Sequence, residues 1–200
     1  MTESNTTQRV VAVYGGASII PGGEDWQAAY DVGRSLAAAG YAVLTGGYAG
    51  VMEAASQGAA EAGGRVIGVT VGTFEQRGLV PNPYLNEEVR MDTLQDRLLY
   101  VVTRPDAIVT LRGGVGTLNE VVLAWSLMQV GEISPRPLVL VGPMWRRLIA
   151  VFAEDAVMKP RELGRLVLVD TADDVVPALA AWWANPPTVP LRLGDDGYTP

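Results

Sequence analysis

The 200-residue sequence contains no cysteine, no histidine and only one lysine. These absences exclude disulfides, thiolate nucleophiles, zinc sites built from Cys and His, and mechanisms in which imidazole is the base. The single lysine, Lys159, directly precedes Pro160, and a residue before proline favours extended or turn conformations. We therefore expect Lys159 on a loop, which is a poor position for Schiff-base or pyridoxal-phosphate chemistry. Acid–base chemistry must come from Asp, Glu, Tyr or water, and positive charge from arginine.

Excess positive charge and long apolar runs are also missing. The formal net charge is −7 and the sequence pI is about 4.6, so nucleic-acid binding through phosphate neutralisation is not expected. No apolar run reaches the length of a membrane span, and the polar N-terminus does not resemble a signal peptide. With 48% hydrophobic residues the chain can bury a full core as one domain. The sequence predicts a soluble, cytoplasmic protein with no nucleic-acid or membrane partner.

The sequence does show a regular alternation of apolar strands and helical patterns. Strands are expected at 10–14, 41–45, 65–71, 106–111, 137–141 and 166–170. Helices are expected at 25–39, 50–62, 92–103, 116–130, 144–153 and 171–184. Because almost fully apolar strands are typical of a parallel sheet covered on both faces, we predict a single, doubly wound, Rossmann-like α/β domain.

This domain is expected to span residues 10–184, between a flexible N-terminus at 1–9 and a Pro-rich C-terminal tail at 185–200. The helix at 92–103 is expected to begin with a capping box formed by Asp92 and Gln95. Residues 72–90 lack clear periodicity, and we interpret them as a loop near a site.

Glycine pairs follow three of the expected strands, at 15–16, 46–47 and 113–114. Ligands of doubly wound sheets bind beyond the carboxyl ends of the strands. Three glycine pairs at such ends therefore indicate a binding site more strongly than any one of them does.

The third pair opens the stretch 113–117 (GGVGT), which joins a strand to a helix. Free backbone N–H groups and the positive end of the helix dipole favour a phosphate there, and glycine lets it approach closely. The stretch is neither a dinucleotide-binding G-x-G-x-x-G motif nor a Walker loop. From these residues alone, a tight turn without a ligand remains the alternative.

Two charged residues are candidates for chemistry, and each has a simpler interpretation. Glu120 lies on the opposite side of its helix from the apolar stripe, where an acid near the N-terminus can also serve the helix dipole alone. Arg97 lies off the apolar stripe of its helix, which by itself predicts a solvated arginine.

Together these segments resemble the LOG (Lonely Guy) family, whose mark is P-G-G-x-G-T-x-x-E. Residues 113–120 match this mark except for its proline, and Arg97 lies fifteen residues before Arg112, where the family has the arginine of an M-x-x-R-K segment. Residues 46–52 (GGYAGVM) are similar to the family's G-G-G-x-x-G-L-M segment. Residues 16–18 (GAS) are similar to the loop after its first strand.

The resemblance implies a homodimeric Rossmann-like protein that hydrolyses the N-glycosidic bond of a nucleoside 5′-monophosphate, with AMP or a cytokinin riboside monophosphate as substrate. By position, Arg97 and Glu120 inherit the catalytic roles. The substrate and phosphate would be bound by Ser18, Gly46, Gly47, Gly113, Gly114, Gly116 and Thr117. We expect neither a metal nor a cofactor.

The chain departs from the family pattern at four positions. Arg112 replaces the proline, Leu98 the lysine after the arginine, Tyr48 a glycine and Asn119 a common glutamate. Arg112 offers a positive charge in place of the missing lysine. Residues 50–54 (GVMEA) are also similar to relatives that bind nucleotides or the molybdenum cofactor, so binding without hydrolysis is the alternative function.

Overall fold

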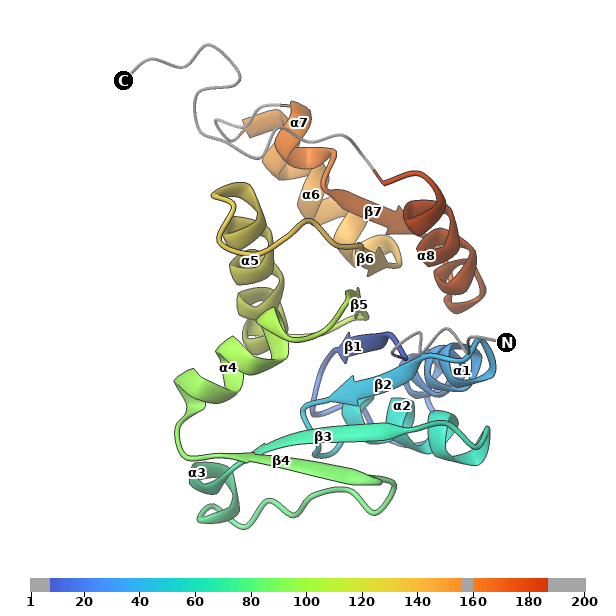
Figure 1. Cartoon of the computed structure of the whole chain (residues 1–200), viewed down its shortest axis with the longest axis vertical. Coiled ribbons are helices and arrows are strands. Elements are labelled where there is room, and N and C mark those ends of the chain that lie inside the picture. The colour runs from blue at the N-terminus through green and yellow to red at the C-terminus, as the bar shows by residue number, and fades with distance from the viewer. Residues whose placement is uncertain (1–7, 156–159, 187–200) are drawn as a thin grey trace, which may run out of the picture.

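The computed structural model describes residues 8–155 and 160–186, so the expectations for Lys159, residues 1–7 and residues 187–200 lie outside it. Seven parallel strands form one sheet in the order β4-β3-β2-β1-β5-β6-β7 (Figure 1). They are β1 (Val10–Tyr14), β2 (Ala42–Thr45), β3 (Val66–Val71), β4 (Glu87–Met91), β5 (Ala107–Thr110), β6 (Leu138–Val141) and β7 (Leu166–Val169). The chain order reverses between β1 and β5, which makes this the switch point of a Rossmann-like sheet.

The α-helices are α1 (Glu24–Ala38), α2 (Val51–Glu61), α3 (Gly72–Glu75), α4 (Leu94–Thr103), α5 (Val115–Gln129), α6 (Pro143–Asp155), α7 (Pro160–Leu163) and α8 (Val175–Ala184). A 3-10 turn, η1 (Ala172–Asp174), leads into α8. Among the described residues, no helix is long and apolar enough to cross a membrane.

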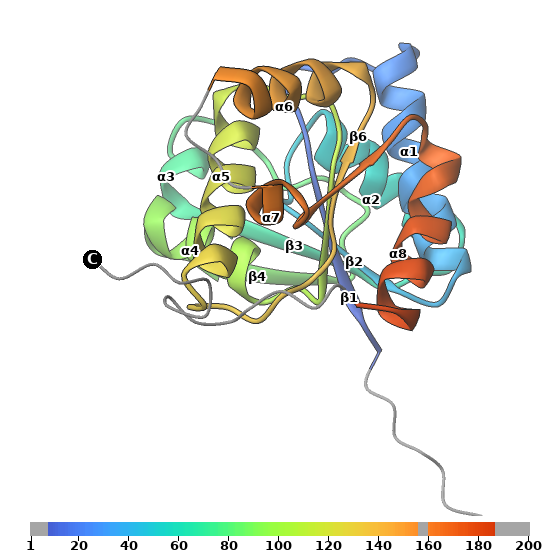
Figure 2. The ribbon, with the colours of Figure 1, turned by 90° about the horizontal axis from the view of Figure 1, so that it is seen from above.

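Helices cover both faces of the sheet (Figure 2). The core on one face is formed with α1, α2 and α8, and the core on the other with α4, α5 and α6. Successive side chains of a strand point to opposite faces, so Val11 and Val13 of β1 join the first core while Ala12 and Tyr14 join the second. All four side chains are buried. Burial on both faces explains the continuous apolar strands, and the predicted fold class is confirmed.

The interpretation of residues 72–90 as a loop near a site is correct only in part. Residues 76–86 lie outside helices and strands, but α3 and most of β4 flank them. β4 extends the sheet beyond β3, with Val69 opposite Val89. It reads EEVRM, and its charged side chains are mostly exposed at the sheet edge, where Glu87 pairs with Arg65 at 2.5 Å. Charge on an edge strand opposes pairing with other chains, and it also hides the apolar pattern by which a strand is recognised.

Helices α1 and α2 approach so closely that their contact requires glycine on both sides. A Cβ on Gly33 would lie 2.0 Å from the carbonyl oxygen of Ala55, and a Cβ on Gly58 would lie 2.0 Å from that of Tyr30. Backbone atoms in a packed core cannot give way as the end of a flexible side chain does. The contact therefore fixes the position of α2, whose first turn borders the cavity described below.

We expect Gly58→Ala to lower the free energy of unfolding by about 2 kcal/mol, because the added methyl group forces the two helices apart. Gly116→Ala is the matched control: a Cβ there meets nothing within 4 Å, so the better helix former should stabilise by up to about 1 kcal/mol. Urea denaturation without ligand measures both. Equal changes for the two variants would show that the α1–α2 contact has room for a side chain.

Candidate functional site

A cavity of about 740 Å³ opens at the carboxyl edge of the sheet, at the switch point between β1 and β5. Loops after β1, β2 and β5 contribute to it, together with the first turns of α2, α4 and α5. Its lining residues are Val13, Tyr14, Gly15, Gly16, Ala17, Ser18, Gly46, Met52, Phe74, Leu94, Gln95, Arg97, Leu98, Gly114, Gly116, Thr117, Asn119 and Glu120. Seven of the nine site residues expected from the sequence lie in this lining; Gly47 and Gly113 do not.

The turn from β5 into α5 presents bare backbone to the cavity. Gly114 is the N-cap of α5 and supplies no capping side chain, so the first amides of the helix are left to solvent or a ligand. A Cβ on Gly114 or Gly116 would meet nothing within 4 Å, whereas one on Gly113 would lie 2.2 Å from Oγ1 of Thr117. Gly113 therefore packs the turn, while Gly114 and Gly116 line the cavity. This arrangement suits an anionic group at the positive end of α5.

Glu120 lies in the second turn of the same helix and also lines the cavity. Its side chain is partly buried and has no hydrogen-bond partner among the residues that the structure describes. Burial raises the pKa of this carboxyl from 4.5 to about 7, and the positive charge of Arg97 opposes that rise. A carboxyl that titrates near neutral pH can take up or release a proton during a reaction, which an acid serving only the helix dipole does not need to do.

The expectation of a solvated Arg97, drawn from the helical pattern alone, was wrong. Arg97 is 7% exposed, and its guanidinium is held against the strand ends. Its Nε donates to the carbonyl oxygen of Val69 at 2.7 Å, and its Nη2 donates to that of Gly46 at 2.9 Å. Its Nη1 has no hydrogen-bond partner in residues 8–155 and 160–186. Because Arg97 lines the cavity, this nitrogen is available to a ligand.

The expected capping box of α4 was also wrong. Thr93, rather than Asp92, is the N-cap, and its Oγ1 accepts a hydrogen bond from the backbone N of Asp96 at 3.1 Å. Thr93 Oγ1 also donates to the Asp96 carboxylate at 2.6 Å, so the two side chains close the start of the helix one position later than the sequence suggested. The cap fixes the first turn of α4, which carries Arg97 into the cavity wall.

Two aromatic residues that the sequence analysis did not place in the site support Arg97. The rings of Tyr48 and Phe74 lie with their centroids 5.8 and 5.6 Å from the guanidinium carbon, and they pack edge to face on each other. The Tyr48 hydroxyl donates to the carbonyl of Val71 and accepts from its N–H, at 3.1 and 2.8 Å. Two features of the sequence could have indicated these residues. Tyr48 stands where the family has a glycine, and Phe74, one of the two phenylalanines of the chain, lies in a segment without periodicity.

Gly46 and Gly47 have different roles in the loop after β2. A Cβ on Gly46 would lie 2.0 Å from Nη2 of Arg97, so the guanidinium occupies the space that a side chain would need. Gly47 has a φ of +80° and its carbonyl accepts from the backbone N of Asn82 at 2.8 Å, so it shapes the turn rather than the cavity. Ser18 is exposed at the rim.

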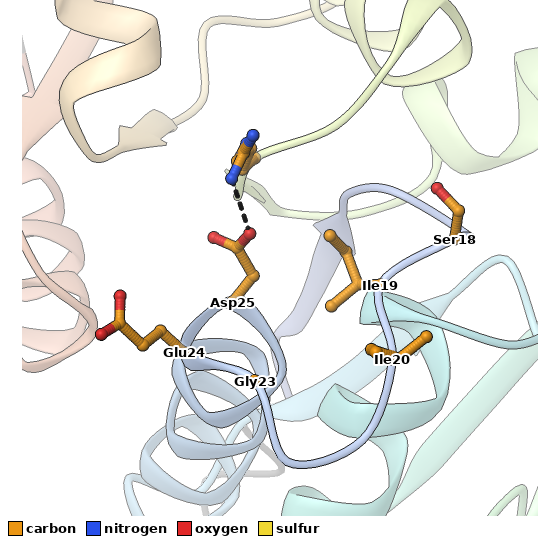
Figure 3. A pocket seen from close by; sticks show the side chains of 7 residues that line it. Ser18, Ile19, Ile20, Gly23, Glu24 and Asp25 are labelled. Atoms are coloured by element: carbon orange, nitrogen blue, oxygen red, sulfur yellow. Dashed lines mark hydrogen bonds and ion pairs between the residues drawn. The ribbon is translucent and has the colours of Figure 1, made fainter.

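A second cavity, of about 330 Å³, adjoins the first and shares Ser18 with it. Figure 3 shows Ser18, Ile19 and Ile20 on the loop after β1, opposite Asp25 at the start of α1. Nη1 of Arg112 forms an ion pair with Oδ2 of Asp25 at 3.0 Å, and this pair closes one side of the cavity.

In the part of the chain that the structure describes, no group of three or more His, Cys, Asp or Glu side chains is placed to hold a metal ion. The charged groups that line the larger cavity are Arg97 and Glu120. The chemistry that these described residues offer is therefore proton transfer by a carboxyl, charge stabilisation by a guanidinium and anion binding by backbone amides.

We expect Glu120→Gln to change the pH dependence of stability. Since the pKa of Glu120 is raised on folding, the folded protein holds this proton more tightly, and the wild type loses stability as pH rises through 4.5 to 7. Between pH 5.5 and 8 this loss is about 2 kcal/mol, and Glu120→Gln should lack it. Urea denaturation at both pH values measures the difference, with exposed Glu132→Gln as control. The same pH dependence in all three proteins would contradict burial of the charge.

Comparison with known proteins identifies the family of this chain. Residues 52–179 match a family described as possible lysine decarboxylase. A cytokinin riboside 5′-monophosphate phosphoribohydrolase of Mycobacterium tuberculosis is 32% identical over 177 residues, which cover 85% of this chain and 92% of that protein. The match to the family model spans more than half of the chain.

Solved structures show the same fold. The molybdenum cofactor binding protein of Rippkaea orientalis aligns with a TM-score of 0.70 at 22% identity, over 88% of this chain and 98% of that one. The molybdenum cofactor carrier protein of Chlamydomonas reinhardtii aligns with a TM-score of 0.69 at 24% identity, over 89% and 99%. Sequence and fold thus agree, and the chain belongs to the LOG family, the family described as possible lysine decarboxylases.

Proposed function

We propose that the protein hydrolyses the N-glycosidic bond of a nucleoside 5′-monophosphate, releasing the free base and ribose 5-phosphate. The observation that carries the proposal is that Glu120, Arg97 and the open glycine turn of α5 line one cavity. The similarity to a phosphoribohydrolase at 32% identity supports the same reaction. AMP and its N6-substituted, cytokinin-type derivatives are the proposed substrates.

The order of the strands gives the cavity two chemically different ends. The glycine turns after β1 and β5 lie on one side, and the α5 amides there suit the 5′-phosphate. On the other side, toward β2, β3 and β4, the lining includes the apolar side chains of Met52, Phe74, Leu94 and Leu98, with Gln95 beside them. That end suits the flat, largely apolar surface of a base. A nucleotide held in this way has its ribose near Glu120 and Arg97.

Glu120 is proposed as the general base. Its carboxylate takes a proton from water, the water oxygen bonds to C1′, and the C1′–N bond breaks with its electron pair passing to the base. The departing base takes up a proton, which Glu120 or solvent supplies. The carboxylate also stabilises the positive charge that develops on the ribose as the bond breaks. A pKa near 7 suits a group that first accepts and then returns a proton.

Arg97 is proposed to bind the substrate through Nη1 while its other nitrogens hold the backbone of Val69 and Gly46. Because the guanidinium is fixed before the ligand arrives, little freedom is lost when the nucleotide binds. A lysine here cannot satisfy both carbonyls and a ligand with the same planar geometry.

We expect Glu120→Gln to lose more than about tenfold in the rate of base release from AMP, since the proton acceptor is removed. In the wild type, kcat/KM should rise with pH through about 7, as Glu120 loses its proton. Chromatography of the free base from a panel of nucleoside and cytokinin-type monophosphates measures both, with Glu132→Gln as control. Undiminished turnover in Glu120→Gln would overturn the assignment of the base.

A carrier that binds a nucleotide or pterin without cleaving it is the second candidate. The observation that favours it is Leu98, which lines the cavity where the family has a lysine, so one positive charge is missing from this wall. The same panel decides between the two: tight binding with no base released from any monophosphate would favour the carrier.

Decarboxylation of lysine is not proposed, although the family's description mentions it. Such chemistry uses a lysine to hold the cofactor, and the sequence has only Lys159. Purified protein that retained a pyridoxal chromophore would overturn this judgement.

We also propose that the protein is a homodimer, joined through α4 and α5, which pack beside each other. Exposed apolar side chains gather on these helices, among them Leu99 (49% exposed) and Val122 (45%). Leu99→Glu and Val122→Glu are expected to convert a dimer to a monomer, because a charge is costly at a buried interface. Sedimentation velocity measures the mass, with Val151→Glu on α6 as control. A wild-type monomer would contradict the proposal.

A further inference from the structure

We infer that the cavity beside Arg112 is a subsite for a second phosphoryl group, so that the site takes nucleoside 5′-diphosphates, free or esterified, as well as monophosphates. The inference rests on the proposed placement of the 5′-phosphate at the start of α5. It assigns a role to Arg112, which the proposed reaction does not use.

The two cavities are neighbours at the position where the 5′-phosphate is proposed to bind. Ser18 lines both, and Arg112 lines the smaller cavity directly before the glycine turn. The backbone N of Gly16 donates to the carbonyl of Arg112 at 3.0 Å, which ties the loops after β1 and β5 together. A group attached to the 5′-phosphate on its outer side therefore extends past Ser18 toward Arg112.

The guanidinium of Arg112 can exchange its present partner for a phosphate. It is 68% exposed and contacts the Asp25 carboxylate through Nη1, and its other nitrogens form no hydrogen bond within the described ranges. An exposed ion pair of this kind contributes little free energy, whereas arginine binds phosphate oxygens through two parallel hydrogen bonds. The Asp25 side chain thus competes with a phosphate for Arg112 and holds it aside when no diphosphate is bound.

The remaining lining of this cavity suits a neutral group beyond the second phosphate. Glu24 and Asp25 lie at the start of α1, where their carboxylates can accept hydrogen bonds from sugar hydroxyls. Ile19 and Ile20 provide apolar surface on the opposite side (Figure 3). The volume of about 330 Å³ is larger than one phosphoryl group needs. A diphosphate esterified with a sugar fills it better than a free diphosphate.

The test compares substitutions of the two partners of the ion pair. If Arg112 binds a phosphate, the two substitutions change the affinity for ADP in opposite directions, whereas a merely structural ion pair predicts changes in the same direction. We expect Arg112→Ala to weaken binding of ADP and ADP-ribose by about tenfold, with AMP affected less than about twofold. Asp25→Asn should instead strengthen ADP binding by about two- to fivefold, because it frees Arg112 and removes a negative charge. Isothermal titration calorimetry at low salt measures all three ligands, with every variant made in the Glu120→Gln background so that AMP is not hydrolysed during the titration.

The matched control is the ion pair of Arg34 and Asp31 on the outer part of α1, at 2.9 Å, where Arg34→Ala should leave all affinities unchanged. Equal losses for Arg112→Ala and Asp25→Asn, or equal loss of AMP and ADP in Arg112→Ala, would overturn the inference. Binding of AMP by the wild type without release of base would contradict the proposed reaction but leave the subsite standing. Tighter binding of ADP-ribose than of ADP would identify the esterified diphosphate as the preferred class.

Discussion

The buried guanidinium of Arg97 is the interaction on which the site depends. Moving a charged group out of water costs several kcal/mol unless hydrogen bonds replace its hydration. Here the carbonyls of Val69 and Gly46 replace part of it, and two aromatic rings cover the guanidinium. These partners come from β3, the loop after β2, and α3. The arginine therefore holds three separate segments in one arrangement and requires a glycine at position 46.

Arg97 also affects the pKa of Glu120, the carboxyl that lines the same cavity. Burial raises the pKa of Glu120 and the charge of Arg97 lowers it, and the larger effect of burial leaves the value at about 7. Burial likewise lowers the pKa of Arg97 while Glu120 raises it, although the arginine stays charged. Without Arg97 the pKa of this carboxyl would lie higher still, and less of it would be ionised at neutral pH. The pKa of each of these two side chains thus depends on the charge of the other.

The sequence predicted what local patterns and strand ends determine. Apolar runs identified six of the seven strands, and the glycine pairs marked the correct edge of the sheet. Three features depended on partners far away in the chain. Arg97 is buried because Val69, 28 residues earlier, offers a carbonyl. β4 is recognisable only through its pairing with β3. Phe74 lines the cavity and packs edge to face on Tyr48, and no periodicity in either segment indicates that contact.

The departures from the family motif move positive charge rather than simply remove it. Leu98 stands on α4 where the family has a lysine, so a positive charge is missing on the side of the cavity proposed for the base. Arg112 adds one before the glycine turn, on the side proposed for the phosphate. Arg112 lines the smaller cavity and not the larger one, so the added charge lies beyond the end proposed for the 5′-phosphate. In the proposed binding mode a cation there is remote from the glycosidic bond, so its proposed role is in ligand selection rather than in bond cleavage. The carboxyl at position 120 is retained, so these departures change the charge at the two proposed ends of the ligand and leave the proposed base in place.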